Sequence, residues 1–160
     1  MSVPAVTLDS AAMALLLERF APAEASGVLL AGSRARGSAG PYSDVDWLRL
    51  AHSDEALPGD GSYLIDGRLV VVSTLTPAFV ESIFNDPSAA CTYVMGLRTA
   101  RILLDREGAV ARLQRRARDF VWDAAMQSKA NQWAAEQMVG IIRDGDLVGN
   151  DRAVRQRDDH

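Results

Sequence analysis

Near the start of the chain, apolar residues recur at helical spacing and are followed by a short uninterrupted apolar run. Residues 9–20 predict an amphipathic helix with Asp9 or Ser10 as its N-cap. Its apolar positions lie mostly three or four residues apart: Met13, Leu16, Leu17 and Phe20. The run GVLLA at residues 27–31, bounded by glycines, predicts a buried strand. Residues 32–40 are rich in Gly, Ser and Arg, which predicts a turn or the start of a short helix.

The middle of the chain carries the patterns of three further strands. Residues 45–51 (VDWLRLA) alternate as a strand does, and the intervening loop at 52–61 is polar. Two more apolar runs, at 63–65 and 68–75, flank Asp66–Gly67. Asp-Gly between apolar runs is the strongest short-range signal of a β-hairpin, so these two runs are expected to pair antiparallel.

Helical signals follow the hairpin. Thr76 is a predicted N-cap for a helix that begins with Pro77 and runs to about residue 84. The sequence Asn-Asp-Pro at 85–87 interrupts it, and Ser88 is expected to cap a second helix to about residue 97. Residues 100–104 (ARILL) predict one more strand.

The last third of the chain predicts two helices, over residues 107–126 and 128–143, with Gly145 ending the second. The positions expected to be buried are Leu113, Phe120, Val121, Trp133, Met138 and Ile142. Strands and helices therefore mix along the chain, and the hairpin requires a partly antiparallel sheet. The expected fold class is α/β (α+β), with a mixed central sheet, flanking helices and two C-terminal helices.

The expected organisation is a single domain, because 160 residues hold one ordinary core and hardly two. Residues 1–106 form the predicted core and residues 107–145 its helical extension. Residues 146–160 contain few apolar side chains and are expected to form a flexible tail.

Composition narrows the classes of function. A net charge of −4 gives no bulk attraction to nucleic acid or to an anionic membrane, and Cys91 is the only cysteine, which excludes a disulfide framework. The N-terminus lacks the pattern of a signal peptide, and no apolar run is long enough to cross a bilayer, so a cytoplasmic location is expected. Lys129 is the only lysine beside sixteen arginines, so any side-chain cation that contacts phosphate is expected to be arginine.

The segment between residues 27 and 50 (GVLLAGSRARGSAGPYSDVDWLRL) carries the chemistry. Gly32, at the end of a predicted strand, allows the backbone to approach a ligand closely. Free backbone N–H groups around Ser33 and Arg34 suit an anion such as phosphate, and Arg34 and Arg36 add cationic donors.

An acidic pair follows at the start of the next strand. Asp44 and Asp46 lie two residues apart, so their side chains emerge on the same face. Two carboxylates about 4 Å apart repel by about 4 kcal/mol at an effective dielectric constant near 20, and a divalent cation removes that cost. Hard oxygen ligands favour magnesium shared with substrate phosphates. A phosphate-binding turn with an acidic pair outlines a metal–nucleotide site.

This segment resembles the signature of the nucleotidyltransferase superfamily that includes DNA polymerase beta. The likeness is to its small bacterial branch, with aminoglycoside nucleotidyltransferases and minimal nucleotidyltransferases. The family pattern is a Gly-Ser after the first strand, a spacer, and an acidic pair around an apolar residue. The matching positions are Gly32, Ser33, Asp44, Val45 and Asp46. Arg36, Gly37 and Ser43 also match residues that are frequent at these positions in the bacterial branch.

The resemblance implies a nucleotidyltransferase fold and the transfer of a nucleoside monophosphate from a triphosphate, with ATP expected, to a hydroxyl of a small molecule (aminoglycoside-like) or of a protein. Asp44 and Asp46 would be the catalytic metal ligands, for magnesium or manganese. Gly32, Ser33, Arg36 and Ser43 would bind the nucleotide. A homodimer or a helical partner protein is expected to complete so short a chain, and nucleic acid and membrane are not expected as partners.

One departure from the family pattern leaves two interpretations open. The family usually carries a third acidic residue in the strand after the hairpin turn, and Val71 occupies that position here. Asp66 lies in the turn itself, where it is best explained as a turn-forming residue. Either the chain is a nucleotidyltransferase, impaired or with a base from elsewhere, or it is a degenerate member that acts as a nucleotide sensor or antitoxin-type binding partner.

Overall fold

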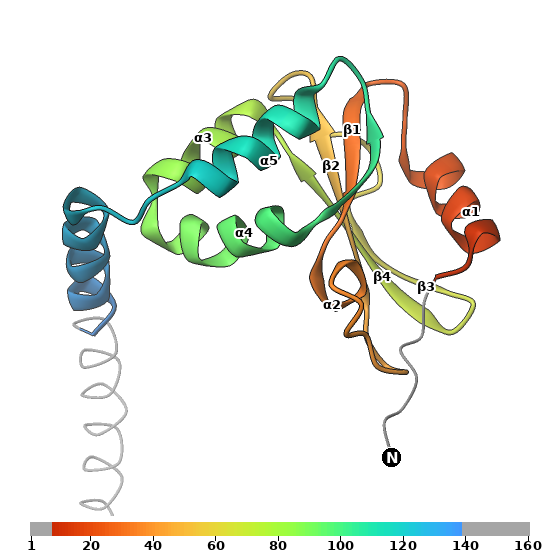
Figure 1. Cartoon of the computed structure of the whole chain (residues 1–160), viewed down its shortest axis with the longest axis horizontal. Helices are drawn as coiled ribbons and strands as arrows, with labels where there is room; N and C mark the ends of the chain where they lie inside the picture. The colour runs from red at the N-terminus through yellow and green to blue at the C-terminus, as the bar shows by residue number, and fades with distance from the viewer. Residues whose placement is uncertain (1–7, 139–160) are drawn as a thin grey trace, which may run out of the picture. The chain divides into compact units, whose positions relative to one another are not determined.

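The computed structural model describes residues 8–138 and forms a five-stranded sheet with helices on both faces (Figure 1). In chain order the elements are α1 (Ser10–Phe20), β1 (Ala25–Leu30), α2 (Gly32–Ala35), β2 (Val45–Ala51), β3 (Gly61–Ile65), β4 (Arg68–Leu75), α3 (Pro77–Asn85), α4 (Pro87–Thr99), β5 (Arg101–Asp105) and α5 (Ala109–Asp119). The strand order is β3-β4-β2-β1-β5. Strands β2 and β4 pair parallel and the other neighbours pair antiparallel, which confirms the mixed sheet expected from the sequence.

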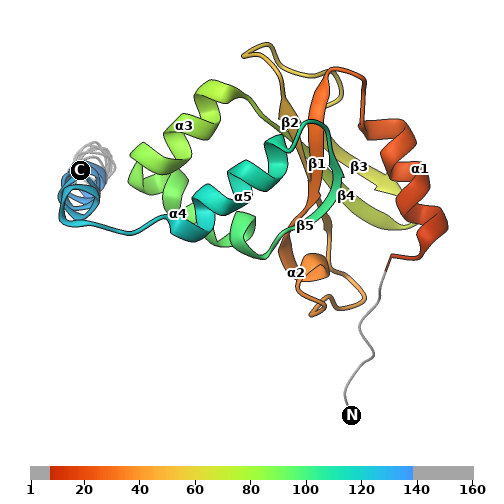
Figure 2. The same cartoon turned by 45° about the horizontal axis from the view of Figure 1, so that its top comes forward.

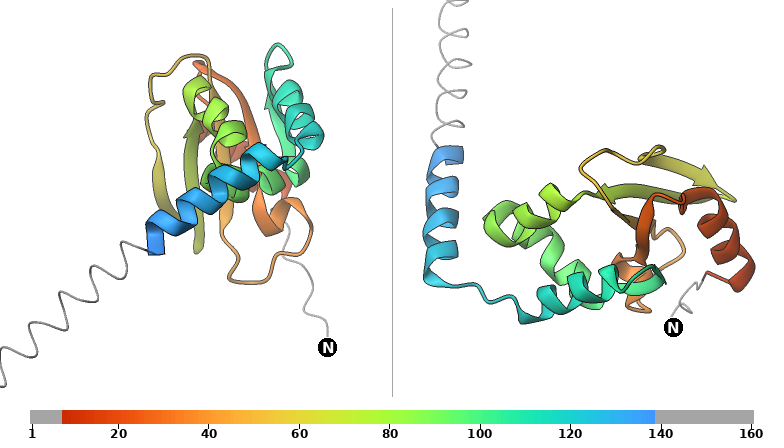
Figure 3. Two further views of the ribbon diagram at one scale, coloured as in Figure 1. Left: turned by 90° about the vertical axis from the view of Figure 1, so that its left-hand side faces the viewer. Right: turned by 90° about the horizontal axis from the view of Figure 1, so that it is seen from above.

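The two faces of the sheet carry separate hydrophobic clusters. Helix α1 packs through Met13, Leu16 and Phe20 on the face that holds Val45 and Trp47 (Figure 2). Helices α3, α4 and α5 cover the other face, where they pack against residues that include Leu29, Leu50 and Leu75 (Figure 3). Alternation along β2 therefore places Asp46 on the side of α3, α4 and α5.

Capping residues explain where most helices begin. The side chains of Asp9 and Thr76 accept hydrogen bonds from the third residue after each, as the sequence predicts. Helix α4 differs from expectation, because Asp86 rather than Ser88 is its N-cap, with Pro87 in the first turn. The hairpin turn at Asp66–Gly67 has positive φ at both residues, the requirement that Asp-Gly meets best.

Helix α5 packs closely on β1. A Cβ added at Gly27 would lie 2.1 Å from Val110 Cγ2, so glycine is needed there for the helix to approach the strand. The helix ends at Asp119, seven residues before the predicted end, and Arg98 on α4 binds the carbonyl groups at this end. Arg98 Nε donates to the carbonyl of Ala117 and Nη2 to that of Phe120.

The compact unit that contains the sheet ends at Val121, and a second unit begins at Trp122. A helix occupies residues 124–138 of the second unit. Phe120 is partly buried as expected, whereas three predicted core residues are exposed: Val121, Trp133 and Met138. These three predictions are wrong. Val121 lies in the non-helical segment 120–123, and Trp133 and Met138 lie on the helix at 124–138, which has no other described element of its own unit to pack against.

The predictions for Ile142, Gly145 and the tail at 146–160 lie outside the described residues. Within residues 8–138, no helix combines the length and the apolar character needed to cross a membrane.

Candidate functional site

The Gly-Ser turn and the acidic pair meet at one end of the sheet. Because β1 and β2 pair antiparallel, the end of β1 lies beside the start of β2, with Leu30 opposite Trp47. The backbone N–H of Ala31 donates to the carbonyl oxygen of Asp46 at 2.9 Å. The two parts of the sequence motif, separated by ten residues along the chain, are therefore neighbours in space.

Gly32 lies directly against the carboxylate of Asp46. It has φ +67°, and a Cβ added there would lie 1.9 Å from Asp46 Oδ2. Any larger residue would displace the carboxylate as well as strain the backbone. The sequence predicts that Gly32 lets the backbone approach a ligand. In the structure Gly32 also makes room for the Asp46 carboxylate, a candidate metal ligand.

The electrostatics of the acidic pair suit a cation. Burial raises the pKa of the Asp46 carboxyl above its ordinary value, and the neighbouring charge of Asp44 raises it further. Arg36 opposes both effects and lowers the pKa. Asp46 is therefore a partly buried carboxylate whose negative charge is incompletely compensated, and two hard oxygen donors in such a place fit Mg²⁺ or Mn²⁺.

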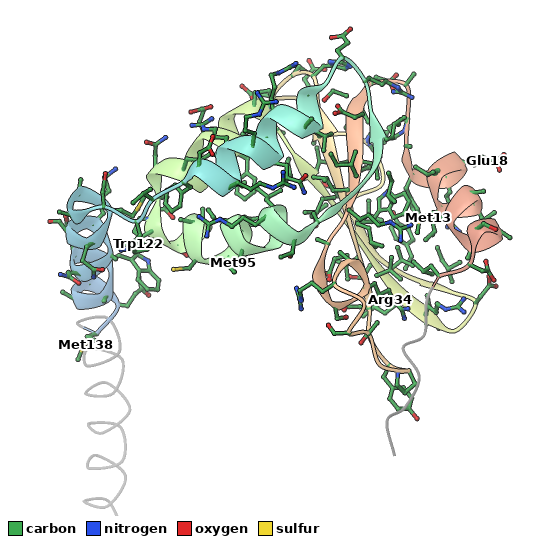
Figure 4. All side chains as sticks on the ribbon, in the orientation of Figure 1. Met13, Glu18, Arg34, Met95, Trp122 and Met138 are labelled. Carbon is green, nitrogen blue, oxygen red and sulfur yellow. The ribbon has the colours of Figure 1, made fainter. Side chains whose placement is uncertain are left out.

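The loop before the pair is held by side chains of the same motif. Arg34 is buried, and its guanidinium donates from Nε to the carbonyl of Asp44 at 2.9 Å and from Nη2 to that of Ser43 at 2.6 Å (Figure 4). The hydroxyl of Ser43 accepts a hydrogen bond from the backbone N–H of Gly40. Ser33, in the short helix α2, accepts through its carbonyl from the backbone N–H of Ser38. Arg36, one turn on, is exposed.

A cavity of about 430 Å³ opens beside the acidic pair, a volume in the range of small-molecule sites. Its lining comprises Ala31, Gly32, Arg36, Asp46, Leu48, Ser73, Thr92, Tyr93, Met95 and Gly96. Three of the predicted site residues line it: Gly32, Arg36 and Asp46. Ser33, Ser43 and Asp44 lie in the adjoining turn and loop and are not in its lining.

The wall formed by β4 and α4 was not predicted. Ser73 could have been found from the sequence, because it lies two residues after Val71 and therefore on the same face of β4. The α4 residues, among them Tyr93 and Met95, reach the cavity only through tertiary packing. Tyr93 makes an edge-on contact with Phe79 of α3, at 5.0 Å between ring centroids, and no local sequence pattern encodes that contact.

Val71 is the direct neighbour of Asp46 across the parallel pair of β2 and β4. The position at which the family usually has a third acid is thus adjacent to the pair in space and carries an apolar side chain. Asp66 lies in the hairpin turn and lines a small hollow on the α1 side of the sheet with Leu8 and Leu15. Among residues 8–138, no three His, Cys, Asp or Glu side chains form a group able to hold a metal ion.

A second hollow, of about 680 Å³, lies at the opposite end of the same sheet face, between α3 and α5. Its acidic and basic side chains are largely engaged with one another or with the backbone. Glu81 pairs with Arg116 through both carboxylate oxygens, and Asp54 accepts from the N–H of Ala78 at the start of α3. The Glu81–Arg116 pair thus joins α3 and α5 along this hollow.

No family model matches the chain, and no curated protein matches it. Among the solved structures that resemble it is the crystal structure of a nucleotidyltransferase-like protein from Exiguobacterium sibiricum, with a TM-score of 0.51 and 17% sequence identity. The chain has a nucleotidyltransferase-like fold. The similarity covers 68% of this chain and 37% of the Exiguobacterium chain, so this chain spans little more than a third of its relative's length. At this identity the similarity shows the fold, which confirms the predicted fold class.

Proposed function

We propose that the protein transfers a nucleoside monophosphate from a nucleoside triphosphate, ATP being the expected one, to a hydroxyl group. The observation that carries the proposal is the contact of Gly32 with the Asp46 carboxylate, beside Asp44 and within the Coulomb field of Arg36. This contact supports the proposal because the turn, whose backbone N–H groups suit phosphate, lies against one carboxylate of an acidic pair that suits a divalent cation.

The acidic residues would bind the cation, and the turn with Arg36 would bind the triphosphate. Asp44 and Asp46 would hold magnesium or manganese, which would neutralise charge on the triphosphate and on the leaving pyrophosphate. Ser33, with the backbone near Gly32 and the guanidinium of Arg36, would bind the triphosphate. In the reaction the acceptor oxygen forms a bond to the α-phosphorus, the bond from this phosphorus to the bridging oxygen breaks, and pyrophosphate leaves with that electron pair.

The proton of the acceptor hydroxyl has no third carboxylate to receive it at the position of Val71. A general base contributes about 10²–10⁴-fold to a rate, so transfer that releases this proton to water would be slow by that factor. Slow transfer is the form of the reaction that this site supports.

The surface beside the pair favours some acceptors over others. On the face that carries Asp46, the uncovered end of the sheet presents Leu64, which is 79% exposed, and its cross-strand partner Leu69. Charges of both signs act within the motif: Arg36 and Asp44 act on Asp46, and Arg68 and Asp44 act on Arg34. The exposed leucines favour an acceptor hydroxyl on an apolar body, such as a protein segment, over an aminoglycoside-like molecule.

Val71 also supports a second candidate function. An apolar residue beside the acidic pair leaves a metal–nucleotide site without a base, which suits a protein that binds the nucleotide without turning it over. Such a protein would act as a nucleotide sensor or an antitoxin-type partner.

A nucleotide panel with Mg²⁺ tests both candidates, with thermal shift to measure binding and pyrophosphate release to measure transfer. Transfer predicts Mg²⁺-dependent stabilisation by ATP together with slow pyrophosphate release. Binding without release in the presence of any acceptor supports the sensor. Stabilisation that is unchanged in the Asp44→Asn/Asp46→Asn double variant contradicts both.

A further inference from the structure

Arg34 is a buried charged residue in a segment that also carries fully exposed residues. Only 8% of its surface is accessible, whereas Tyr42, in the loop that follows α2, is 98% exposed. A guanidinium loses hydration when it is buried, and it needs several acceptors in return. Arg34 finds two of them in consecutive backbone carbonyls, those of Ser43 and Asp44.

These two carbonyls belong to the residues that lead into β2. The ladder between β2 and β4 begins at Val45, opposite Val70, and β2 pairs with β1 from Trp47 onward. Asp46 therefore lies within the sheet, but Asp44 precedes the first ladder residue. Sheet hydrogen bonds fix the position of Asp46, and the Arg34 guanidinium fixes the backbone of Asp44.

The same guanidinium joins the two halves of the motif. Arg34 is in α2, between Gly32, which contacts the Asp46 carboxylate, and Arg36, which acts on that carboxylate electrostatically. Its planar fork reaches two acceptors at once, which a lysine ammonium cannot do with the same geometry. A displacement of α2 would therefore be transmitted to Asp44 through two short hydrogen bonds.

We propose that Arg34 is a positioning residue that sets the distance between Asp44 and Asp46, and so tunes the affinity of the pair for a divalent cation. The inference rests on the proposed function, because it assigns the acidic pair as the cation site. It gives Arg34 a different role from Arg36. Arg34 holds the backbone of Ser43 and Asp44, whereas Arg36 lines the cavity.

The chain contains a matched control. Arg98 on α4 also donates from Nε to one carbonyl and from Nη2 to another, at 2.7 Å each, at the end of α5. Arg34→Lys and Arg98→Lys therefore remove the same fork and keep the same charge. Only the first change is made next to the acidic pair.

The test measures Mn²⁺ binding to the full chain by electron paramagnetic resonance, with the thermal midpoint as a second readout. Both variants are expected to lower the thermal midpoint. Arg34→Lys is also expected to weaken Mn²⁺ binding by about 10- to 100-fold, the usual cost of losing a group that orients a metal ligand. Arg98→Lys is expected to leave Mn²⁺ binding unchanged.

Mn²⁺ binding that is unchanged in Arg34→Lys, or equally weakened in both variants, overturns the inference. Wild-type protein that binds no Mn²⁺ overturns the proposed function and the cation role together. Amide hydrogen exchange over residues 38–46 then tests whether Arg34 holds this loop, independently of any cation. Faster exchange in Arg34→Lys alone shows that Arg34 holds this loop, and equal exchange in the two variants removes that role as well.

Discussion

At the scale of single residues, the site depends on how closely Gly32 and Asp46 approach. The glycine has a left-handed backbone conformation and touches the carboxylate, and the carboxylate is partly buried beside a second acid. Both features constrain the folded protein. Residue 32 must be glycine, and the charge of Asp44 repels the ionised carboxylate of Asp46. Each constraint can be measured separately.

Gly32→Ala is expected to destabilise the protein by more than its backbone conformation alone requires. An alanine with left-handed φ costs about 1–2 kcal/mol, and here its Cβ would also meet Asp46 Oδ2. Gly37→Ala is the matched control, because Gly37 has φ +72° with nothing within 4 Å of an added Cβ. Urea unfolding of the two variants should show the larger loss for Gly32→Ala, and Mg²⁺-dependent ATP binding should fall only in that variant. Equal losses would contradict the close contact.

Asp46→Asn is expected to stabilise the metal-free protein at neutral pH. Burial and Asp44 raise the pKa of Asp46 in the folded state, so the folded protein keeps a proton at pH values where the unfolded chain has released it. That contribution to stability is present below the unfolded pKa of about 4 and is lost as pH rises through the raised folded pKa. At pH 7–8 the ionised carboxylate therefore destabilises the fold.

Thermal melts with EDTA between pH 4 and pH 8 check this prediction. The melting temperature of Asp46→Asn should exceed that of the wild type at the upper end, and the difference should shrink toward pH 4. Each kcal/mol corresponds to about 2–4 °C for a chain of this size. Glu18→Gln, an exposed change on α1, is the control and should show no such trend. A wild type that is more stable than Asp46→Asn at pH 8 without metal would refute the repulsion.

At the scale of elements, the sequence predicts most helices and strands because their signals are local. The Asp-Gly turn, the caps Asp9 and Thr76 and the apolar runs each act within a few residues, and the structure has the elements that they predict. The end of α5 was missed, and the carbonyl groups there are bound by Arg98, about twenty residues away in the sequence, a contact that no local pattern shows. Asp86 and Ser88 are both good caps, and the pattern could not choose between them.

The same distinction explains the candidate site. The Gly-Ser turn and the acidic pair lie within fifteen residues and were found together. Tyr93 and Met95 reach the cavity because α4 packs over the sheet, which is a property of the assembled layers rather than of any local pattern.

The parallel register of β2 and β4 gives a prediction at this scale. Val71→Asp would place a third carboxylate beside Asp46, and under the proposed function it should raise the rate of pyrophosphate release by about 10²-fold or more. It should also lower the melting temperature without metal and enlarge the stabilisation by Mg²⁺, because three acids repel more than two. Val71→Asn keeps a polar side chain of similar size without the charge and should give neither gain. A rate unchanged in Val71→Asp would favour the nucleotide sensor.

At the scale of the whole molecule, the unit that contains the sheet has hydrophobic clusters of its own. All three hydrophobic clusters consist of residues from Leu8 to Phe120, and every residue assigned to the candidate site lies before residue 97. The clusters on the two faces of the sheet and the candidate site are therefore formed from residues of the first unit.

Removal of the chain from residue 122 onward is expected to leave the fold and the site intact. The melting temperature and the Mg²⁺-dependent ATP shift of the shortened protein should match those of the full chain within a few degrees. Removal from residue 109 onward is the contrasting control, because α5 supplies Val110, Leu113 and Ala117 to the core, and it should abolish cooperative unfolding. If the protein shortened at residue 122 lost the Mg²⁺-dependent shift of its melting temperature by ATP, the second unit would contribute to the site.

The register that sets Val71 beside Asp46 also has a genetic consequence. Every valine codon becomes an aspartate or a glutamate codon when its central uracil changes to adenine. A single nucleotide substitution therefore separates this site from one with three carboxylates, whichever codon the gene uses. Because the position is defined by strand pairing rather than by a loop, such a change would need no insertion and no rearrangement of the chain. Gain and loss of the third acid are thus equally short evolutionary steps in this fold.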